Sequence, residues 1–550
     1  MSIKKPKIVM IGERLGSRAF NGANKALHVL ASSLHNYGYD NVIQMDLERP
    51  TLTLEEVINE CKDADSIWFV GALATQWPEI DKHSKMIYDS LSKERKKNVP
   101  IIVGGYAVKG VEPIAEKTPW ITAYFNGEGE KGAVELAESI EKGTFSQDKS
   151  KIKGLCFMDE RGIFHESIAD RVENLDGFDQ NYGLVHVSGI HNMNIFTENG
   201  RQLKTAQLYC QRGCPYKCGF CNKSKESKEV RFVGDAWFEE LVKGLRKHGF
   251  EAVYLDDDTE TISQREFRSK LEILSKYGLK VGMNTRIDIE ADRLRKLRPG
   301  EESNIKFARD HGCVYQFFGV EHTDPGVLMA IEKFQGSVAN QERRAEQYRE
   351  DVKLVFQEME RCNVPSSYFL IIGLPKEIKE KWGPSHRPTT LEEDEEEIRF
   401  ALEKCNPDYL NFNILRFMPG SKAADVLSSP FRCVSPSKKS VLKADWFLPR
   451  VRRLSQYGKY SYKDQEYHPV FRLYESLTEN QPRSIAITPE RAYETMGYAI
   501  NLINQRIDQG KKATQLFVDH EVMKKGLVKR DTKGHYWIAP INDFRILESK

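Results

Sequence analysis

The stretch Cys210-Gln-Arg-Gly-Cys214-Pro-Tyr-Lys-Cys218-Gly-Phe-Cys221 places four cysteines within twelve residues. The last three follow the spacing C-x3-C-x2-C, on a segment that also contains glycine and proline and therefore predicts a loop. Three thiolates this close together can converge on one point, which suits a cubane iron–sulfur cluster with its fourth iron left open. An open iron can chelate a small molecule and pass it an electron.

Two other readings of the cysteines are open. Together with Cys210, the motif could form a closed tetrahedral zinc site, although such sites usually pair two cysteine knuckles across a spacer. Cys210 ends the apolar stretch 206–210, which predicts a strand entering the loop, so we interpret it as a packed strand residue. A disulfide framework is disfavoured because the remaining cysteines are isolated, at Cys61, Cys156, Cys313, Cys362, Cys405 and Cys433.

The cysteine motif, preceded by Arg-Gly and with Phe220 before its last cysteine, resembles that of the radical S-adenosylmethionine (SAM) superfamily. The resemblance implies that Cys214, Cys218 and Cys221 hold a [4Fe–4S] cluster whose open iron binds SAM. One electron would then cleave SAM to methionine and a 5′-deoxyadenosyl radical, which removes a hydrogen atom from the substrate. The protein's part would be to bind, orient and exclude water.

Residues 201–425 predict six strands that alternate with helices, as a partial (β/α)6 barrel requires. Polar and glycine residues follow the predicted strands, at the end where such barrels build their sites. The family pattern implies SAM contacts for residues at these strand ends and in the cysteine loop, namely Phe220, Arg286, Gly319, Glu321 and Gly373. The alternative interpretation of Arg286 and Asp288 is a surface ion pair.

The sequence departs from the family pattern at two strand ends. Leu255-Asp-Asp-Asp258 stands where Gly-Gly-Glu-Pro is common, and Gly319-Val-Glu-His322 replaces Gly-Val-Glu-Ser. His322, Asp256 and Asp258 are therefore weak candidates for catalytic groups. The alternatives are a hydrogen-bonded structural histidine, and carboxylates that cap a helix or bind a cation.

Residues 1–150 also alternate strands and helices, which predicts a doubly wound, Rossmann-like parallel sheet. Thr53-Leu-Glu-Glu56 predicts a helix start through a capping box. Glycines just past the predicted strands fit a ligand crevice at the carboxyl edge of the sheet, or simply tight turns. These glycines are Gly71, Gly104, Gly105 and Gly127.

This region resembles the cobalamin-binding domain that precedes many radical SAM enzymes, most closely at residues 103–105 and 126–130. Such domains often carry D-x-H-x-x-G after the first strand, where the histidine ligates cobalt. The corresponding stretch here, residues 12–22, contains no histidine. Either cobalt lacks a histidine ligand, or the domain has lost its cofactor. We predict cobalamin binding at the four glycines named above.

The rest of the chain predicts a connector at 151–200, with a hairpin around residues 159–162, and a mainly helical C-terminal cap or substrate domain at 426–550. Thr390-Leu-Glu-Glu393 predicts a second capping box after a loop at 376–391 that covers the site. Pro489 predicts a helix start and Gly510 its end. Aromatic and basic residues at 446–462 suit a helical cap better than nucleic-acid stacking.

Composition sets outer limits on function. Hydrophobic residues make up 40% of the 550 residues and charged residues 29%, as in an ordinary globular protein. With a net charge of +2, no global field attracts nucleic acid or membranes. We find no apolar stretch of membrane-spanning length. The unpaired cysteines favour a reducing cytoplasm.

These patterns together predict a cobalamin-dependent radical SAM enzyme that methylates an unactivated carbon of a small-molecule or natural-product substrate. One SAM would supply the methyl group and a second the radical, with electrons from a flavodoxin- or ferredoxin-type donor. The first alternative is radical rearrangement, ring formation, dehydration or bond cleavage, with cobalamin absent or in another role. The second is a zinc-stabilised binding module without catalytic activity.

Overall fold

The computed structural model describes residues 5–13, 25–47, 52–72, 76–105, 108, 111–177, 196–198, 201–221, 223, 229–380, 383–415, 489–517 and 528–538. The chain divides into two compact units. Residues 1–210 and 231–254 belong to the first unit, and residues 211–230 and nearly all of those after 254 belong to the second. The predicted cap boundary and the aromatic run at 446–462 lie outside the described residues.

The first sheet has seven strands in the order β2-β1-β3-β4-β5-β6-β7. The pairs from β2 to β5 are parallel, which is the doubly wound arrangement expected for alternating strands and helices. The strands are β1 (Ile8–Gly12), β2 (Val42–Asp46), β3 (Ser66–Phe69), β4 (Ile101–Gly104), β5 (Ala123–Phe125), β6 (Leu155–Met158) and β7 (Phe164–His165).

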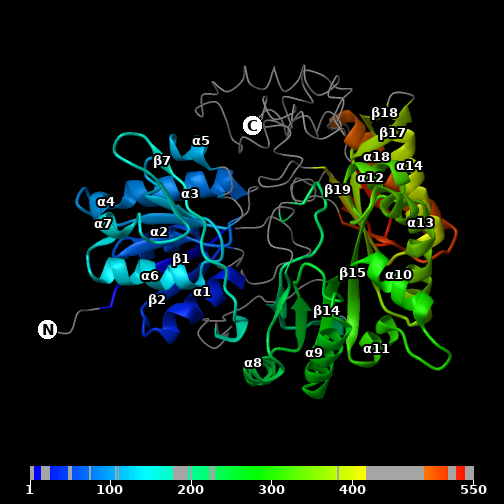
Figure 1. Ribbon diagram of the computed structural model, residues 1–550, viewed down its shortest axis with the longest axis horizontal. Helices are drawn as coiled ribbons and strands as arrows, with labels where there is room; N and C mark the ends of the chain where they lie inside the picture. The colour runs from blue at the N-terminus through cyan, green and yellow to red at the C-terminus, as the bar shows by residue number, and fades with distance from the viewer. Residues whose placement is uncertain are drawn as a thin grey trace. The chain divides into compact units, whose positions relative to one another are not determined.

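Both faces of this sheet are covered by helices. Successive apolar side chains of a central strand point to opposite faces, and each face packs into its own hydrophobic core. Ile8 and Met10 belong to one hydrophobic core, Val9 and Ile11 to the other. Helices α1 and α6 pack on the first core, and α2 and α3 on the second (Figure 1). The helices of this sheet are α1 (Lys25–Asn36), α2 (Leu54–Cys61), α3 (Trp77–Ser90), α4 (Arg95–Asn98), α5 (Glu112–Ala115), α6 (Glu130–Glu141) and α7 (Phe145–Asp148).

Local signals in this region behave as predicted. The Thr53 side chain accepts a hydrogen bond from the Glu56 amide, and the Glu56 carboxylate accepts one from Thr53, so the capping box is confirmed. The predicted hairpin around residues 159–162 is also present, as strands β6 and β7. The segment predicted as a connector also contributes to the first sheet, since β6 pairs antiparallel with β5 and extends that sheet.

The second large sheet follows the order β10-β13-β14-β15-β16-β19-β20. Its strands therefore neighbour one another in chain order, as in a barrel, with helices in the connections. The strands are β10 (Thr205–Leu208), β13 (Ala252–Leu255), β14 (Lys280–Thr285), β15 (Cys313–Glu321), β16 (Ser366–Ile372), β19 (Tyr409–Ile414) and β20 (Gln515–Phe517). The helices are α8 (Asp235–Lys247), α9 (Gln264–Lys276), α10 (Ile287–Lys296), α11 (Asn304–Asp310), α12 (Pro325–Ala330), α13 (Val338–Arg361) and α14 (Leu391–Phe400).

Two differences from the sequence prediction concern this sheet. The predicted loop at 376–391 is largely an antiparallel ribbon, formed by β17 (Pro375–Glu380) and β18 (Gly383–Pro388). The sequence of this segment is mostly polar and has no apolar alternation. Such a pattern does not tell an irregular loop from a two-stranded ribbon. The sheet also has a seventh strand, β20, which pairs parallel with β19 and comes from the region predicted as a mainly helical cap.

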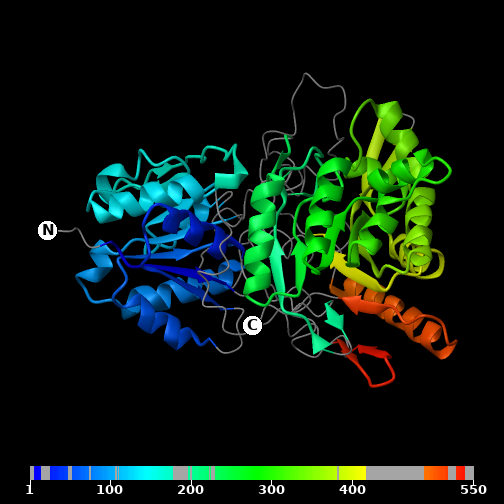
Figure 2. The same cartoon turned by 90° about the horizontal axis from the view of Figure 1, so that it is seen from below.

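The described part of that C-terminal region begins at Pro489, where the predicted helix α18 (Pro489–Asp508) starts. The helix ends just before Gly510, which has a positive φ of 67° as a C-terminal glycine should. Tyr498 of α18 accepts a hydrogen bond from Arg399 of α14 at 2.7 Å. Figure 2 shows α18 beside the small hairpin of β21 (Val528–Arg530) and β22 (Tyr536–Ile538).

Further short strands are β8 (Thr197–Glu198), β9 (Arg201–Gln202), β11 (Gln211–Arg212) and β12 (Arg231–Phe232). The second capping box, at the start of α14, is confirmed by hydrogen bonds between Thr390 and Glu393. No helix in the described ranges combines the length and the apolar character that crossing a bilayer requires.

Candidate functional site

The cysteine loop begins just after β10 and lies between the short strands β11 and β12, which pair with each other. Cys218 is buried, whereas Cys214 and Cys221 are half-buried. Gly213 starts the loop with a φ of 104°, and a Cβ at this position would lie 2.4 Å from the carbonyl oxygen of Glu229. Any larger residue would clash here, which explains on steric grounds why a glycine precedes the first cysteine of the motif.

The C-terminal part of the loop is held by backbone hydrogen bonds. The Gly219 amide donates to the carbonyl of Ile331 at 2.7 Å, and the Cys221 amide donates to the carbonyl of Cys218 at 3.0 Å. Phe220, predicted to pack near adenine, is half-buried between these two contacts. Its position in the loop is therefore fixed, and its contact with a nucleoside stays a prediction.

The sulfurs have polar neighbours that favour the thiolate. The Lys223 amide donates to Cys221 Sγ at 3.4 Å, and Arg286 Nη1 donates to Cys218 Sγ at 3.7 Å. In the absence of a metal, burial prevails: it raises the pKa of the Cys214 thiol and raises the pKa of Cys221 to about 11. At neutral pH these two thiols are therefore protonated, and metal binding must release their protons.

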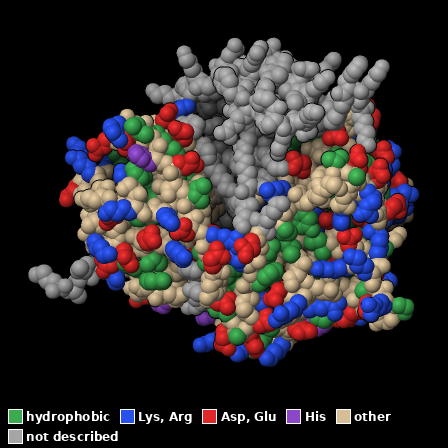
Figure 3. All heavy atoms as spheres, in the orientation of Figure 1, with side chains coloured by type: hydrophobic (Ala, Val, Ile, Leu, Met, Phe, Trp, Pro, Cys, Tyr) green, Lys and Arg blue, Asp and Glu red, His purple; other side chains and the backbone are tan. Residues whose placement is uncertain are grey.

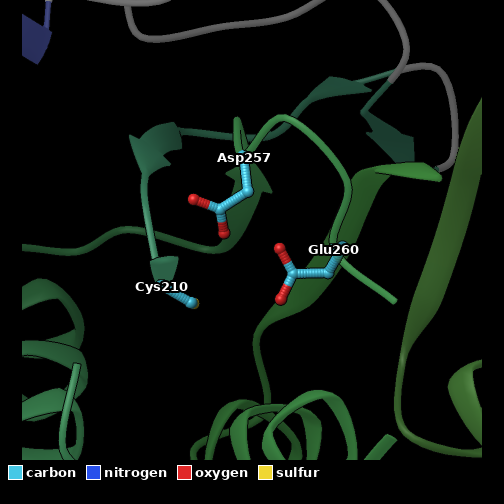
Figure 4. Close-up of side chains that lie close together, drawn as sticks. All are labelled: Cys210, Asp257 and Glu260. Atoms are coloured by element: carbon cyan, nitrogen blue, oxygen red, sulfur yellow. The ribbon is translucent and has the colours of Figure 1, made fainter. Parts of the chain in front are cut away.

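The arrangement of ligand atoms separates Cys210 from the other three cysteines. Within the described ranges, only Cys210, Asp257 and Glu260 form a group of three or more metal-ligand side chains whose atoms lie within 4.8 Å of one another (Figure 4). The other three cysteine sulfurs are spread more widely than this. A single tetrahedral zinc with bonds of about 2.3 Å would hold its sulfurs only about 3.8 Å apart. Wider spacing fits a cubane, in which each cysteine binds a different iron.

Arg286 begins helix α10 directly after β14 and is buried against the cysteine loop. Its guanidinium is paired with Asp288, with Nε 2.9 Å from Oδ1 and Nη2 3.2 Å from Oδ2. It also stacks on the ring of Tyr216, 3.6 Å from the centroid. Burial opposes the charge, but Asp288 outweighs it and holds the pKa of Arg286 above its usual value. Arg286 and Asp288 thus form an ion pair, but the pair is buried and does not lie on the surface. The SAM contact of Arg286 stays a prediction.

We expect Arg286→Met to destabilise the protein by about 3 kcal/mol, because it leaves the buried carboxylate of Asp288 without its main partner. Arg344, 3.6 Å from Asp288, offsets only part of that loss. The measurement is denaturant unfolding followed by circular dichroism. The double variant Arg286→Met/Asp288→Leu should recover most of the stability. Equal losses in the single and double variants would contradict this account.

Glu321 ends strand β15 with a positive φ of 68°, which is a strained conformation for a side chain of this size. Its carboxylate is buried, and Oε1 lies 3.2 Å from the ammonium of Lys333. Oε2 is buried without a hydrogen-bond partner in the part of the chain that the structure describes. A Cβ at Gly319 would lie 2.7 Å from Oε1, so this glycine makes room for the carboxylate.

Lys333 joins the carboxylate to the cysteine loop. Its ammonium donates to Gly319 and Glu321, while its carbonyl accepts a hydrogen bond from Arg286 Nη2 at 3.1 Å. The same carbonyl lies 4.0 Å from Cys218 Sγ. Lys333 therefore contacts the Glu321 carboxylate, the guanidinium of Arg286 and the thiol of Cys218, which belongs to the three-cysteine loop. This donor set fits a cluster with an amino- and hydroxyl-bearing ligand beside it.

His322 follows Glu321 and is buried against helix α14. Its Nδ1 accepts a hydrogen bond from the Asp324 amide at 3.0 Å and lies 3.4 Å from Glu397 Oε2. Glu397 in turn accepts from the amide and hydroxyl of Thr323, at 2.9 and 2.6 Å, and from Tyr368. These contacts resemble those of a structural histidine, and a role as substrate base stays a prediction.

The three aspartates after β13 have different surroundings. Asp257 is buried and accepts a hydrogen bond from the Gln211 amide at 3.2 Å. Asp258 is half-buried and forms an ion pair with Lys223. Asp256 is half-buried beside them. The predicted catalytic candidates Asp256 and Asp258 are thus next to the cysteine loop, and their chemical role is not tested.

The glycines predicted to bind cobalamin lie at strand ends of the first sheet. The local backbone conformation and packing explain by themselves why several of these positions are glycine. Gly105 has a φ of 129°, and a Cβ there would lie 2.4 Å from the amide nitrogen of Ala72. Gly127 has a φ of 114° and approaches Ala169. Gly71 also has a positive φ, whereas Gly104 accepts a hydrogen bond from Ala72 at 2.9 Å. Cobalamin binding at this edge stays a prediction, as does SAM contact at Gly373, which has a φ of 76° after β16.

Sequence reasoning missed several residues that the fold brings to the site. Lys333 follows helix α12 in a turn, and nothing in the local sequence connects it with Glu321. Tyr216 had a weak signal, since it is an aromatic residue between the first two cysteines. Asp257 and Glu260 lie in an acidic segment after a strand. Helix capping already explained the acidic residues there, so the sequence did not single out these two.

The Rossmann-like sheet and the barrel-type sheet, with a three-cysteine loop after the first barrel strand, form an architecture that solved cobalamin-dependent radical SAM enzymes share. Comparison with solved structures gives the same fold. The radical SAM methyltransferase TsrM from Kitasatospora setae, with tryptophan substrate and aza-SAM bound, matches with a TM-score of 0.55 and 17% identity over 77% of this chain and 76% of that chain. The cobalamin-dependent SAM radical enzyme OxsB, with aqua-cobalamin and SAM bound, matches with a TM-score of 0.56 and 14% identity over 92% and 68%.

Sequence comparison finds relatives with two kinds of name. The anaerobic magnesium-protoporphyrin IX monomethyl ester cyclases of Cereibacter sphaeroides and Rubrivivax gelatinosus are 26% identical over 294 residues and 24% over 388 residues, covering 52% and 70% of this chain. The match spans 44% and 62% of those proteins, less than two thirds of either. An uncharacterized methyltransferase of Pyrococcus horikoshii is 24% identical over 381 residues, 68% of this chain and 71% of that protein. No protein-family model matches the chain. The predicted fold class and family resemblance are confirmed.

Proposed function

We propose that this chain binds a [4Fe–4S] cluster on Cys214, Cys218 and Cys221, SAM beside Glu321, and cobalamin at the carboxyl edge of the first sheet. The observation that carries the proposal is the convergence of Cys218, Arg286 and the orphaned Glu321 carboxylate on Lys333. When bound, the cluster supplies the electron that cleaves SAM. The protein's residues hold the cluster, neutralise nearby charge and accept hydrogen bonds from the ligand.

Methylation of an unactivated carbon on a small molecule is the leading reaction. It is favoured by the similarity to TsrM over most of both chains and by the methyltransferase among the sequence relatives. The second candidate is radical ring formation, which the two cyclase relatives favour. The two candidates share the cluster and the SAM site, and they differ in the fate of the substrate and in whether a second SAM is consumed as methyl donor.

The test is an anaerobic incubation of cluster-loaded protein with SAM, reductant, hydroxocobalamin and candidate small molecules. Methylation predicts 5′-deoxyadenosine together with S-adenosylhomocysteine, and a product heavier by one methyl group. Ring formation predicts 5′-deoxyadenosine without S-adenosylhomocysteine. The absence of both compounds, from protein with a full complement of iron, would contradict the proposal.

The proposed partners are a small-molecule substrate and an electron donor of the flavodoxin or ferredoxin type. Acidic and basic side chains are interspersed on the face shown in Figure 3, so no extended field of one sign stands out there. Such a surface suits a transient contact with a small redox protein better than capture of a polyanion. The proposed cellular location is the cytoplasm, where thiols stay reduced.

A further inference from the structure

The segment that follows β13, residues 256–261, contacts both ends of the cysteine loop. At the entrance, Asp257 Oδ1 accepts a hydrogen bond from the Gln211 amide at 3.2 Å. The side-chain amide of Gln211 donates to the carbonyl of Thr259. The residue three positions before the first cluster cysteine is therefore bound twice to one segment.

The exit of the loop is held by the neighbouring aspartate. Asp258 forms an ion pair with Lys223, two residues after the last cysteine, and both side chains are largely shielded, with 21% and 27% exposed. The backbone amide of Lys223 is the group that donates to Cys221 Sγ at 3.4 Å. The ion pair thus fixes the residue whose amide contacts a cluster thiol.

This acidic segment is itself attached to the barrel. Asn284 of β14 donates from its side chain to the carbonyl of Asp257 at 3.2 Å, and its carbonyl accepts from the Glu260 amide at 2.9 Å. Figure 4 shows the carboxylates of Asp257 and Glu260 facing each other. Burial, together with the neighbouring carboxylate of Asp257, raises the pKa of Glu260 well above its usual value.

We propose that Asp257 and Asp258 are positioning residues that hold the two ends of the Cys214–Cys221 loop in its cluster-binding arrangement, Asp258 through Lys223. This inference rests on the proposed function, since it concerns how the cluster is retained. The physical reason is entropic: a loop whose ends are fixed on one strand end loses less conformational freedom when its thiols bind metal. The Lys223 amide also stabilises the more negative reduced cluster through its bond to sulfur.

The test compares Lys223→Met, Asp258→Asn and Lys223→Arg with the unaltered chain. Each is loaded anaerobically with iron and sulfide, and three quantities are measured: iron per chain, the rate of iron loss to a chelator, and the reduction potential. We expect the Met and Asn variants to lose iron roughly 10- to 100-fold faster, the range found for groups that orient metal ligands. The potential of Lys223→Met should shift to more negative values, because a cation near the cluster is lost, and Lys223→Arg should keep the original behaviour.

Two controls separate positioning from general stability. Asp310→Asn removes an equivalent but exposed ion pair, that of Asp310 with Lys306 on α11, and should change none of the three quantities. The double variant Lys223→Asp/Asp258→Lys restores an ion pair of reversed sense and should slow iron loss relative to Asp258→Asn. Circular dichroism reports whether each variant is folded.

The outcomes for the two ideas are distinct. Full iron content, an unchanged rate of loss and an unchanged potential in folded Lys223→Met and Asp258→Asn would overturn the positioning role while leaving the cluster in place. If the unaltered chain itself binds no iron, it is the proposed function that fails. Should Lys223→Met prove unfolded, Lys223→Gln and the charge-reversed double variant provide the same comparison.

Discussion

Replacement of Cys218 by alanine is expected to abolish the brown colour of anaerobically prepared protein, together with its iron, its sulfide and all formation of 5′-deoxyadenosine. Cys218 is the buried member of the cysteine trio, and its sulfur accepts a hydrogen bond from Arg286. A cubane left with two cysteine ligands loses both its anchorage and its protection from water. Iron and sulfide per chain and the visible absorption spectrum measure the effect.

The matched control is Cys210→Ala, since Cys210 belongs to the same stretch of sequence. Its sulfur lies beside Asp257 and Glu260 (Figure 4), and a three-cysteine cluster does not need it. We expect this variant to keep its iron and its colour. Loss of the metal in both variants, with one zinc per unaltered chain, would instead establish the closed zinc site.

Substitution of Glu321 by glutamine is expected to weaken SAM binding roughly 10- to 100-fold while the cluster stays intact. The substitution keeps size and shape but removes the negative charge from a buried carboxylate whose Oε2 has no hydrogen-bond partner among the described residues. Hydrogen bonds to charged groups contribute about 1.5–3 kcal/mol, which corresponds to this change in affinity. Titration calorimetry on cluster-loaded protein measures the dissociation constant.

The control for this second prediction is Glu302→Gln, which removes a charge from a half-buried position between α10 and α11. It should leave SAM affinity unchanged. An intact iron content in Glu321→Gln is part of the expectation, because among the described residues Lys333 stands between Glu321 and the cysteine loop. Unaltered affinity in Glu321→Gln would remove Glu321 from the proposed SAM site.

Sequence reasoning was most successful where the signal is local or periodic. Alternating apolar runs and helices predicted both parallel sheets, because a sheet covered on both faces needs apolar residues throughout its strands. The two capping boxes and the glycine stop of α18 depend on neighbours within a few residues, so they can be read directly. The C-x3-C-x2-C spacing predicted a resemblance to radical SAM enzymes, and solved structures of such enzymes have the same fold.

The contacts that complete the site depend on tertiary structure, and the sequence carries no local sign of them. Lys333 meets Glu321 only because α12 returns the chain to the end of β15. The pair of Arg286 and Asp288 was recognised, but its burial follows from packing against Tyr216 and the cysteine loop. Likewise β20 is three residues long, too short for any pattern to predict its pairing with β19.

The pairing of β20 has a consequence for how the molecule stays separate from its copies. A strand at the border of a sheet presents unpaired backbone groups, which recruit strands from other molecules and promote aggregation. Residues 515–517, brought in by α18, fill the hydrogen-bonding positions of β19 at residues 409–411. β20 is thereby the border strand of the sheet, and its three residues offer a shorter template for pairing than the six residues of β19. We expect truncation before residue 489 to leave β19 as the border and to increase self-association of the shortened protein.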